Sequence, residues 1–238
     1  MKNAFFLFAI LVFNFSPLFA QLPGIYPDIE WEKSFGSTSA DVAYSICQTA
    51  DSGYIVAGYS YSDGVIVPGD DVIFYYSIWD TDWWIAKLDK LGNIQWQKTL
   101  GGTEDESPTV IKQTFDGGYI ISGYSQSDDG DLNFHHGSNY LKDYWIVKLD
   151  SIGNIEWQKS LGGTDSDLAW SIQQTADSGF IVAGESFSFN GNVTLNYGEE
   201  DFWVVKLSAA GSIQWEKSYG GSLSEDPLLL FRQVMEVL

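Results

Sequence analysis

The chain has 238 residues, with 32 acidic against 12 basic side chains and a formal net charge of -20. Such a surface repels phosphate backbones and anionic lipid, so nucleic acid and membrane surfaces are excluded as main partners. A content of 45% hydrophobic and 16% aromatic residues excludes a disordered chain, and the single cysteine, Cys47, excludes an internal disulfide.

The first twenty residues have the pattern of a cleaved secretory signal peptide. Lys2 precedes an apolar run, and the small residue Ala20 stands before Gln21. A membrane anchor is the alternative, but the apolar run from Ala4 to Phe13 is shorter than the roughly 20 residues that a spanning helix needs. We therefore expect an exported protein, extracellular or at the cell surface, without membrane insertion.

Residues 21–227 are organised as a repeat. The strings WEKSFGS, WQKTLGG, WQKSLGG and WEKSYGG start at Trp31, Trp96, Trp157 and Trp215, which gives periods of 65, 61 and 58 residues. A period of this length indicates that each unit is one supersecondary structure that packs against its neighbours.

Four strand-like segments recur in each complete unit, each rich in β-branched and aromatic residues and bounded by Gly, Asp, Asn or Ser. A lone outer strand is expected first, at Glu30–Phe35, and no repeat segment has a helical period. Short Gly-containing turns predict that each unit is an antiparallel meander. In chain order the predicted strands are 43–50, 53–60, 82–89 and 93–100, then 108–115, 118–125, 143–150 and 154–161, then 169–176, 179–186, 201–208 and 212–219.

The faces of these strands indicate how the units are stacked. The second strand is apolar on both faces, whereas the fourth alternates, with Trp96 on one face and Gln95 and Gln97 on the other. A sheet that is covered on both faces in its middle and wetted at its edge is typical of a β-propeller blade. The prediction is an all-β, partial β-propeller of about three four-stranded antiparallel blades plus a truncated fourth, with a β-solenoid as the alternative.

The recurring motifs W-x-K-(S/T)-(L/F/Y)-G-G, D-(S/G)-G-(Y/F)-I, D-x-W-(I/V) and G-(N/S)-I-x-W resemble the repeats of secreted bacterial β-propeller proteins of the Bacteroidetes type. The resemblance covers Trp31 to about Pro227. It implies the propeller fold and export but no particular activity, because propellers carry unrelated functions.

The variable loops point to one end of the blades as the recognition face. The connections between second and third strands, about 60–81, 125–142 and 186–200, differ in length and sequence, whereas the other turns are short. In an antiparallel meander these loops emerge at the same end as the crossovers between units. The candidate ligand-binding residues at this acidic end are Asp70, Asp71, Glu104, Asp105, Asp165, Asp167, Glu199 and Glu200.

One loop contains a candidate calcium site. The string SDDGDLN supplies Asp128, Asp129 and Asp131, and Ca²⁺ prefers clustered carboxylate oxygens. The string departs from EF-hand spacing, so a solvated loop is the alternative. His135 and His136 follow without metal partners at a recognised spacing. No cofactor other than this Ca²⁺ is expected.

Several conspicuous residues have structural roles as the simplest explanation. The recurring tryptophans, including Trp84, Trp145 and Trp203, are expected to pack between blades. Asp82, Asp143 and Asp201 precede the third strands and are expected to accept backbone N–H bonds.

No catalytic residue is predicted, because the chain has no nucleophile elbow, His-Glu metal motif or phosphate loop. The expected function is that of an exported module that binds an extracellular protein or glycan. The alternatives are a fragment of a carbohydrate-active enzyme with paired carboxylates and a structural spacer without ligand. Open blade edges also predict self-association.

The last residues, PLLLFRQVMEVL, depart from the repeat. An Asp-Gly-Gly turn is due at 235–237, where the chain has Met235, Glu236 and Val237. Codons read one base earlier recover the Gln-Thr-x-Asp-Gly turn, with an obligatory Gly where Met235 meets Glu236. We therefore expect residues 228–238 to be an out-of-frame tail and the chain to be a fragment of a longer propeller.

Overall fold

The computed structural model describes residues 29–37, 39–61, 79–132, 134–138 and 140–222. Residues 1–32 and 33–238 form two separate compact units, and every strand belongs to the second unit. The predicted signal peptide, Asp70, Asp71 and the predicted out-of-frame tail lie outside the described residues.

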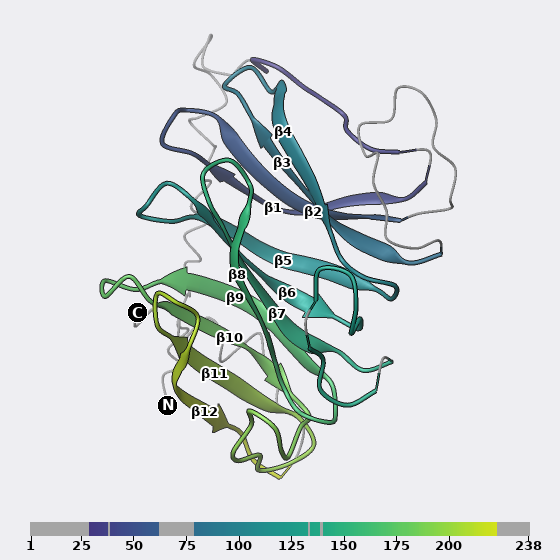
Figure 1. Ribbon diagram of the computed structural model, residues 1–238, viewed down its shortest axis with the longest axis vertical. Coiled ribbons are helices and arrows are strands. Elements are labelled where there is room, and N and C mark those ends of the chain that lie inside the picture. The colour runs from purple at the N-terminus through teal and green to yellow at the C-terminus, as the bar shows by residue number, and fades with distance from the viewer. Residues whose placement is uncertain (1–28, 38, 62–78, 133, 139, 223–238) are drawn as a thin grey trace, which may run out of the picture. The chain divides into compact units, whose positions relative to one another are not determined.

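Twelve strands form three four-stranded antiparallel sheets, paired in chain order within each sheet (Figure 1). The described part of the chain contains no helix, so the all-β class and the four-stranded units are confirmed. The first sheet has β1 (Asp41–Gln48), β2 (Tyr54–Tyr61), β3 (Thr81–Leu88) and β4 (Ile94–Leu100). The second has β5 (Glu106–Gln113), β6 (Tyr119–Ser125), β7 (Asp143–Leu149) and β8 (Ile155–Leu161). The third has β9 (Asp167–Gln174), β10 (Phe180–Ser186), β11 (Asp201–Leu207) and β12 (Ile213–Tyr219).

Aspartate side chains fix the turns between first and second strands. In the second sheet, both Thr114 Oγ1 and Gly118 N donate hydrogen bonds to Asp116 Oδ1. Gly117 has a φ of +84°, in the left-handed region that glycine adopts without a steric penalty. The string Asp-Gly-Gly therefore reverses the chain within a few residues.

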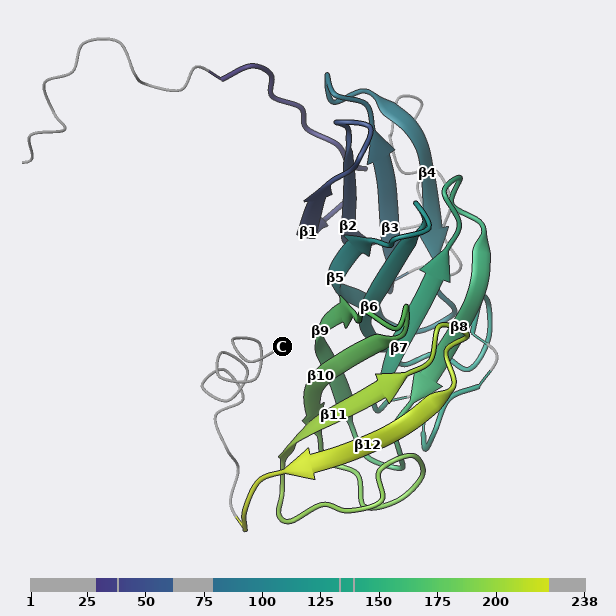
Figure 2. The ribbon, with the colours of Figure 1, turned by 90° about the vertical axis from the view of Figure 1, so that its left-hand side faces the viewer.

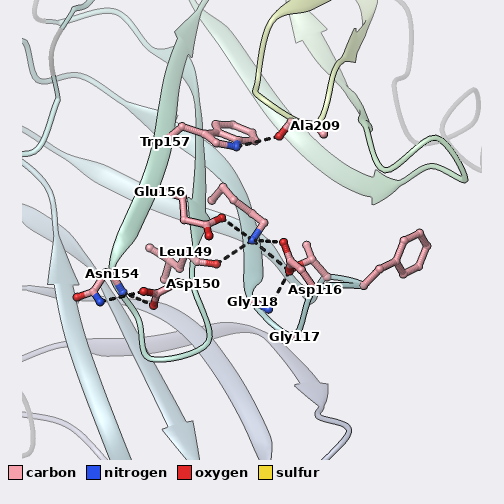
Figure 3. Close-up of polar contacts among 12 residues, drawn as sticks. Asp116, Gly117, Gly118, Leu149, Asp150, Asn154, Glu156, Trp157 and Ala209 are labelled. Carbon is pink, nitrogen blue, oxygen red and sulfur yellow. Dashed lines mark hydrogen bonds and ion pairs between the residues drawn. The ribbon is translucent and has the colours of Figure 1, made fainter.

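A buried lysine in each third strand joins three elements of its own sheet. Lys148 Nζ in β7 lies 3.0 Å from Asp116 Oδ2, 2.9 Å from Glu156 Oε2 and 3.0 Å from Leu149 O (Figure 3). Its side chain is 4% exposed, and a buried ammonium is tolerated only with such partners. Lys87 and Lys206 make the equivalent contacts in the other sheets, with Asp51 and Asp177.

Hydrophobic clusters join neighbouring sheets. Between the first and second sheets the ring centroids of Trp83 and Trp145 are 4.2 Å apart, and between the second and third those of Tyr144 and Trp203 are 4.8 Å apart. All four rings are buried. The predicted packing role of Trp145 and Trp203 between units is confirmed.

The first strand of each sheet lies next to that of its neighbour. β1 contacts β5, β5 contacts β9, and the three strands follow one another along one side of the stack of sheets (Figure 2). The described sheets are not closed into a ring. Side chains on these strands therefore gather from three units of the repeat.

Residues 30–35 do not form the predicted outer strand. A strand needs a neighbour for its backbone N–H and C=O groups, and none of the described strands pairs with this segment. Phe35 instead packs against Trp84 of β3, with ring centroids 6.1 Å apart. The repeat pattern at this position is therefore realised in packing and not in sheet pairing.

Candidate functional site

The long loops and the crossovers lie at one end of the sheets, which we call the loop end; the short turns form the turn end. In the second sheet, Asp131 N donates to Gly101 O at 2.9 Å. In the third sheet, Asn192 N donates to Gly162 O at 2.8 Å. The predicted association of loops with crossovers is therefore confirmed for the described loops of these two sheets.

The three aspartates of the candidate calcium loop have separate surroundings. Asp129 accepts from Thr103 N at 2.9 Å and from Thr103 Oγ1 at 3.0 Å, while Asp131 Oδ2 accepts from Gly101 N at 3.3 Å. Asn190 takes the place of Asp129 in the third sheet and accepts from Thr164 N at 2.9 Å. A neutral amide performs the same role, so the hydrogen bond does not require a charge.

No group of three or more His, Cys, Asp or Glu side chains that could hold a metal ion occurs among the described residues. Asp128, which is exposed, is therefore not brought together with Asp129 and Asp131 as a ligand set. His136 Nδ1 lies 2.9 Å from Asp143 Oδ2, and His135 Nε2 lies 3.0 Å from Leu141 O. Both histidines thus fix their own loop, and calcium remains a prediction.

The predicted ligand-binding acids of the crossovers are placed differently from one another. Asp105 Oδ1 accepts a hydrogen bond from Thr81 N at 2.9 Å, which connects the crossover before the second sheet to β3 of the first sheet. Glu104 and Asp165 donate their backbone N–H groups to Ser127 Oγ and Ser188 Oγ. Glu199 is exposed and Glu200 is half-buried.

Asp167 belongs to a pair of fully buried carboxylates at the junction of the second and third sheets. A Cβ atom built on Gly162 would lie 2.5 Å from Asp143 Oδ1 and 2.5 Å from Asp167 Oδ2, so these oxygens lie within 5 Å of each other. Burial, with a smaller contribution from the Asp143 charge, raises the pKa of Asp167 to about 6. The pair has no contact with solvent.

The same pair recurs at the junction of the first and second sheets. Asp82 Oδ1 and Glu106 Oε2 would lie 1.9 Å and 2.6 Å from a Cβ atom on Gly101. Burial raises the pKa of Glu106 to about 7 despite the hydrogen bond from Ser125 Oγ. Each junction therefore holds a carboxyl group that keeps its proton close to neutral pH.

A β-bulge on the first strand of every sheet presents one variable residue. The β1–β2 ladder shifts between Ala43 and Ser45, the β5–β6 ladder between Pro108 and Val110, and the β9–β10 ladder skips Trp170. The extra residues are Tyr44, Thr109 and Trp170. A bulge turns the extra side chain away from the alternation of the strand.

The exposed bulge residues have aromatic or acidic neighbours on the second strand. The rings of Tyr44 and Tyr59 are 5.7 Å apart, and Lys142 Nζ lies 4.3 Å from the centroid of the Tyr124 ring. Tyr44 is 52% exposed and Trp170 is 40% exposed.

Glu185 connects the second and third sheets at this place. Its carboxyl group interacts with Trp170 and with Glu200 and is also affected by the charge of Lys142. Burial, followed by contact with Glu200, raises the pKa of Glu185. We call this continuous surface the inner strip, and it consists of Tyr44, Tyr59, Tyr124, Lys142, Trp170, Glu185 and Glu200.

Of the predicted ligand-binding residues, only Glu200 belongs to the inner strip. The other members were missed because they lie in or next to strands, where the repeat was taken as structural. The repeat itself contains a signal that could have identified these residues, because the side chains at certain equivalent positions differ between units while the side chains next to them are the same. These positions are 44, 109 and 170, then 59, 124 and 185, then 81, 142 and 200.

No family model matches the chain, and no curated protein is significantly similar to it. The described residues include no helix that is long and apolar enough to cross a bilayer.

Proposed function

We propose that the chain is an exported binding module, built as a partial β-propeller, that binds a glycan along the inner strip. The propeller arrangement is supported by three meander sheets packed face to face, with their first strands adjacent. Export is supported by the signal-peptide pattern of the first twenty residues.

The observation that carries the binding function is the concentration of sequence variation on the inner strip. Tyr44, Thr109 and Trp170 occupy the same bulge position in different sheets, while Ile46, Ile111 and Ile172, two positions further on, are identical, and Ile111 and Ile172 are buried. Constant packing with variable exposed side chains is the pattern of a scaffold that carries a recognition surface.

The chemistry of the inner strip favours a glycan over a protein ligand. Exposed Tyr and Trp rings offer flat apolar faces to the C–H bonds of sugar rings, and the carboxyl groups of Glu185 and Glu200 offer hydrogen bonds to hydroxyl groups. Protein interfaces share the aromatic residues but are depleted in Glu and Asp. The acidic share of the inner strip therefore argues against a protein partner.

The carboxyl groups are arranged for binding and not for glycoside hydrolysis. A glycosidase needs its two carboxyl groups about 5–9.5 Å apart, with the scissile bond between them. Glu185 and Glu200 interact directly with each other, whereas the two carboxyl groups of a glycosidase act on opposite sides of the bond.

A glycan array followed by calorimetric titration of the best glycan tests the proposal. Trp170→Ala is expected to weaken binding by about tenfold, because stacking of one aromatic ring contributes on the order of 1 kcal/mol or more. Phe115→Ala is the matched control, since Phe115 is an exposed aromatic residue at the turn end.

Absence of any glycan signal, or equal loss of affinity in both variants, contradicts the proposal. Binding of a purified protein that is lost in Trp170→Ala would put a protein in the place of the glycan. Hydrolysis of an array glycan would favour the enzyme alternative.

A further inference from the structure

A concave surface lies at the turn end, between the first and second sheets. Its volume is about 450 Å³, a size that falls within the range of small-molecule sites. We call it the turn-end pocket. Its walls include Asp51, Lys87, Gln95, Trp96, Gln113 and Tyr119.

Two aromatic rings, together with Ile152 and Ala50, form the apolar part of the turn-end pocket. Trp96 of β4 and Tyr119 of β6 meet edge to face, with centroids 5.7 Å apart and planes at 62°. Tyr119 is 2% exposed and supports the Trp96 ring, which is half-buried. The indole N–H of Trp96 has no acceptor in the described part of the chain, so it is available to a ligand.

The charged residues of the turn-end pocket neutralise each other. Lys87 Nζ lies 2.8 Å from Asp51 Oδ2, 3.0 Å from Leu88 O and 3.0 Å from Gln95 Oε1. The hydrogen bond from Lys87 holds the pKa of Asp51 well below its usual range, so the ion pair is intact at neutral pH. A charged ligand would have to disrupt this pair, whereas a neutral ligand would not.

The equivalent position between the second and third sheets provides an internal comparison. There, the indole Nε1 of Trp157 donates to Ala209 O at 3.1 Å, so the counterpart of the free N–H is already used (Figure 3). Phe115 is the residue of the second sheet that is equivalent to Ala50 of the first sheet. The turns themselves are held alike, because Ala50 N and Phe115 N each donate at 2.8 Å to a glutamine of the next sheet.

We propose that the turn-end pocket binds a single neutral sugar ring or a similar cyclic polyol. The aromatic corner packs against the apolar face of the ring. The Trp96 N–H and the side chains of Gln95 and Gln113 meet its hydroxyl groups. The pocket shares no residue with the inner strip and does not depend on the function proposed for it.

The test is an NMR titration that follows the tryptophan indole N–H signals of the full chain. The probes are glucose, galactose, mannose, N-acetylglucosamine and myo-inositol, each added separately. At least one probe is expected to shift the Trp96 signal in a saturable manner.

Ala50→Phe copies the residue that the second sheet carries naturally and is expected to weaken this binding by at least about tenfold. Ala176→Phe places the same side chain at the equivalent turn of the third sheet and is expected to leave it unchanged. Trp96→Phe keeps an aromatic face without the N–H and is expected to bind more weakly than the unmodified chain, measured on the backbone signals of Gln95 and Gln113.

The proposal is overturned if no probe shifts the Trp96 signal, or if Ala50→Phe binds as well as Ala176→Phe. Trp170→Ala separates the two sites. Loss of glycan binding at the inner strip with retained probe binding in the turn-end pocket shows that the sites are independent, whereas a Trp96 shift that disappears in Trp170→Ala overturns the turn-end assignment.

Discussion

The two ends of the sheets handle acidic side chains in opposite ways. At the turn end, Asp51, Asp116 and Asp177 each pair with the buried lysine of their own sheet. At the loop end, Glu106 and Asp167 are buried beside another carboxylate. The repeat therefore pairs its acids with lysine at the turn end and buries acids beside one another at the loop end.

The two ends therefore respond to pH with opposite signs. Burial raises the pKa of Asp116, but hydrogen bonds from Thr114, Gly118 and Lys148 outweigh it and lower the value to about 2. This stabilisation is present above the unfolded pKa and is lost as pH falls. Glu106 and Asp167 have raised pKa values, so their contribution is present at low pH and is lost as pH rises through about 6 to 7.

Removal of a turn-end lysine is expected to have the largest effect on stability. Lys148→Ala leaves Glu156 and the Leu149 carbonyl without their partner and is expected to lower the free energy of unfolding by about 3 kcal/mol. Urea unfolding at neutral pH measures the change. Lys112→Ala is the control, because Lys112 is exposed; similar losses in both variants would mean that the buried ion pair has no special role.

Replacement of a loop-end acid is expected to change how stability depends on pH. The unmodified chain is expected to be less stable at pH 8 than at pH 5, because Glu106 ionises while buried. Glu106→Gln cannot ionise and is expected to remove on the order of 2 kcal/mol of this difference. Urea unfolding at the two pH values gives the result, and an unchanged pH slope in the variant would contradict the assignment.

Acid titration probes the turn end in the opposite direction. Between pH 4 and pH 2, protonation of Asp116 is expected to weaken its pairing with Lys148 and to lower the thermal midpoint of the unmodified chain. Asp116→Asn is expected to lose part of this acid sensitivity, by on the order of 1 kcal/mol. Scanning calorimetry measures the thermal midpoint of both chains at each pH. The prediction is wrong if Asp116→Asn and the unmodified chain lose stability in parallel.

The smallest effect is expected at Asp129. Because Asn190 makes the same hydrogen bond in the third sheet, Asp129→Asn is expected to change the free energy of unfolding by less than about 0.5 kcal/mol. The same variant tests calcium. A rise in the melting temperature on addition of Ca²⁺ that disappears in Asp129→Asn would support a calcium site, and a large destabilisation without Ca²⁺ would contradict the equivalence with Asn190.

The strands were predictable because their cause is local. Short runs of β-branched and aromatic residues, bounded by Gly-containing turns, predicted all twelve strands of the three sheets within a few residues. The prediction of a strand at Glu30–Phe35 was wrong, because a strand also needs a neighbouring strand to pair with, and the alignment of the repeats does not show whether one is present.

The candidate site was less predictable, because its residues are brought together by packing between units. Glu185 and Lys142 are distant in sequence, and the charge of Lys142 acts on Glu185 only because the second and third sheets stack. The buried lysines were missed for a related reason. Lys148 lies between apolar residues, which in the sequence is the pattern of a solvent-facing strand position. Its burial is explained only by the neighbouring turn, where Asp116 pairs with it.

The bulge on each first strand has a consequence for how the protein changes over time. Tyr44, Thr109 and Trp170 are left out of the backbone ladder, so a substitution at these positions leaves strand register untouched. Tyr44 and Trp170, which are exposed, can then change with little cost to folding, whereas Thr109 Oγ1 donates hydrogen bonds to Ser122 O and Ala169 O and is held by the fold. A small combinatorial library at 44 and 170 would retain the scaffold while sampling new ligand preferences, and gene duplication of such a unit would add one more adjustable position each time.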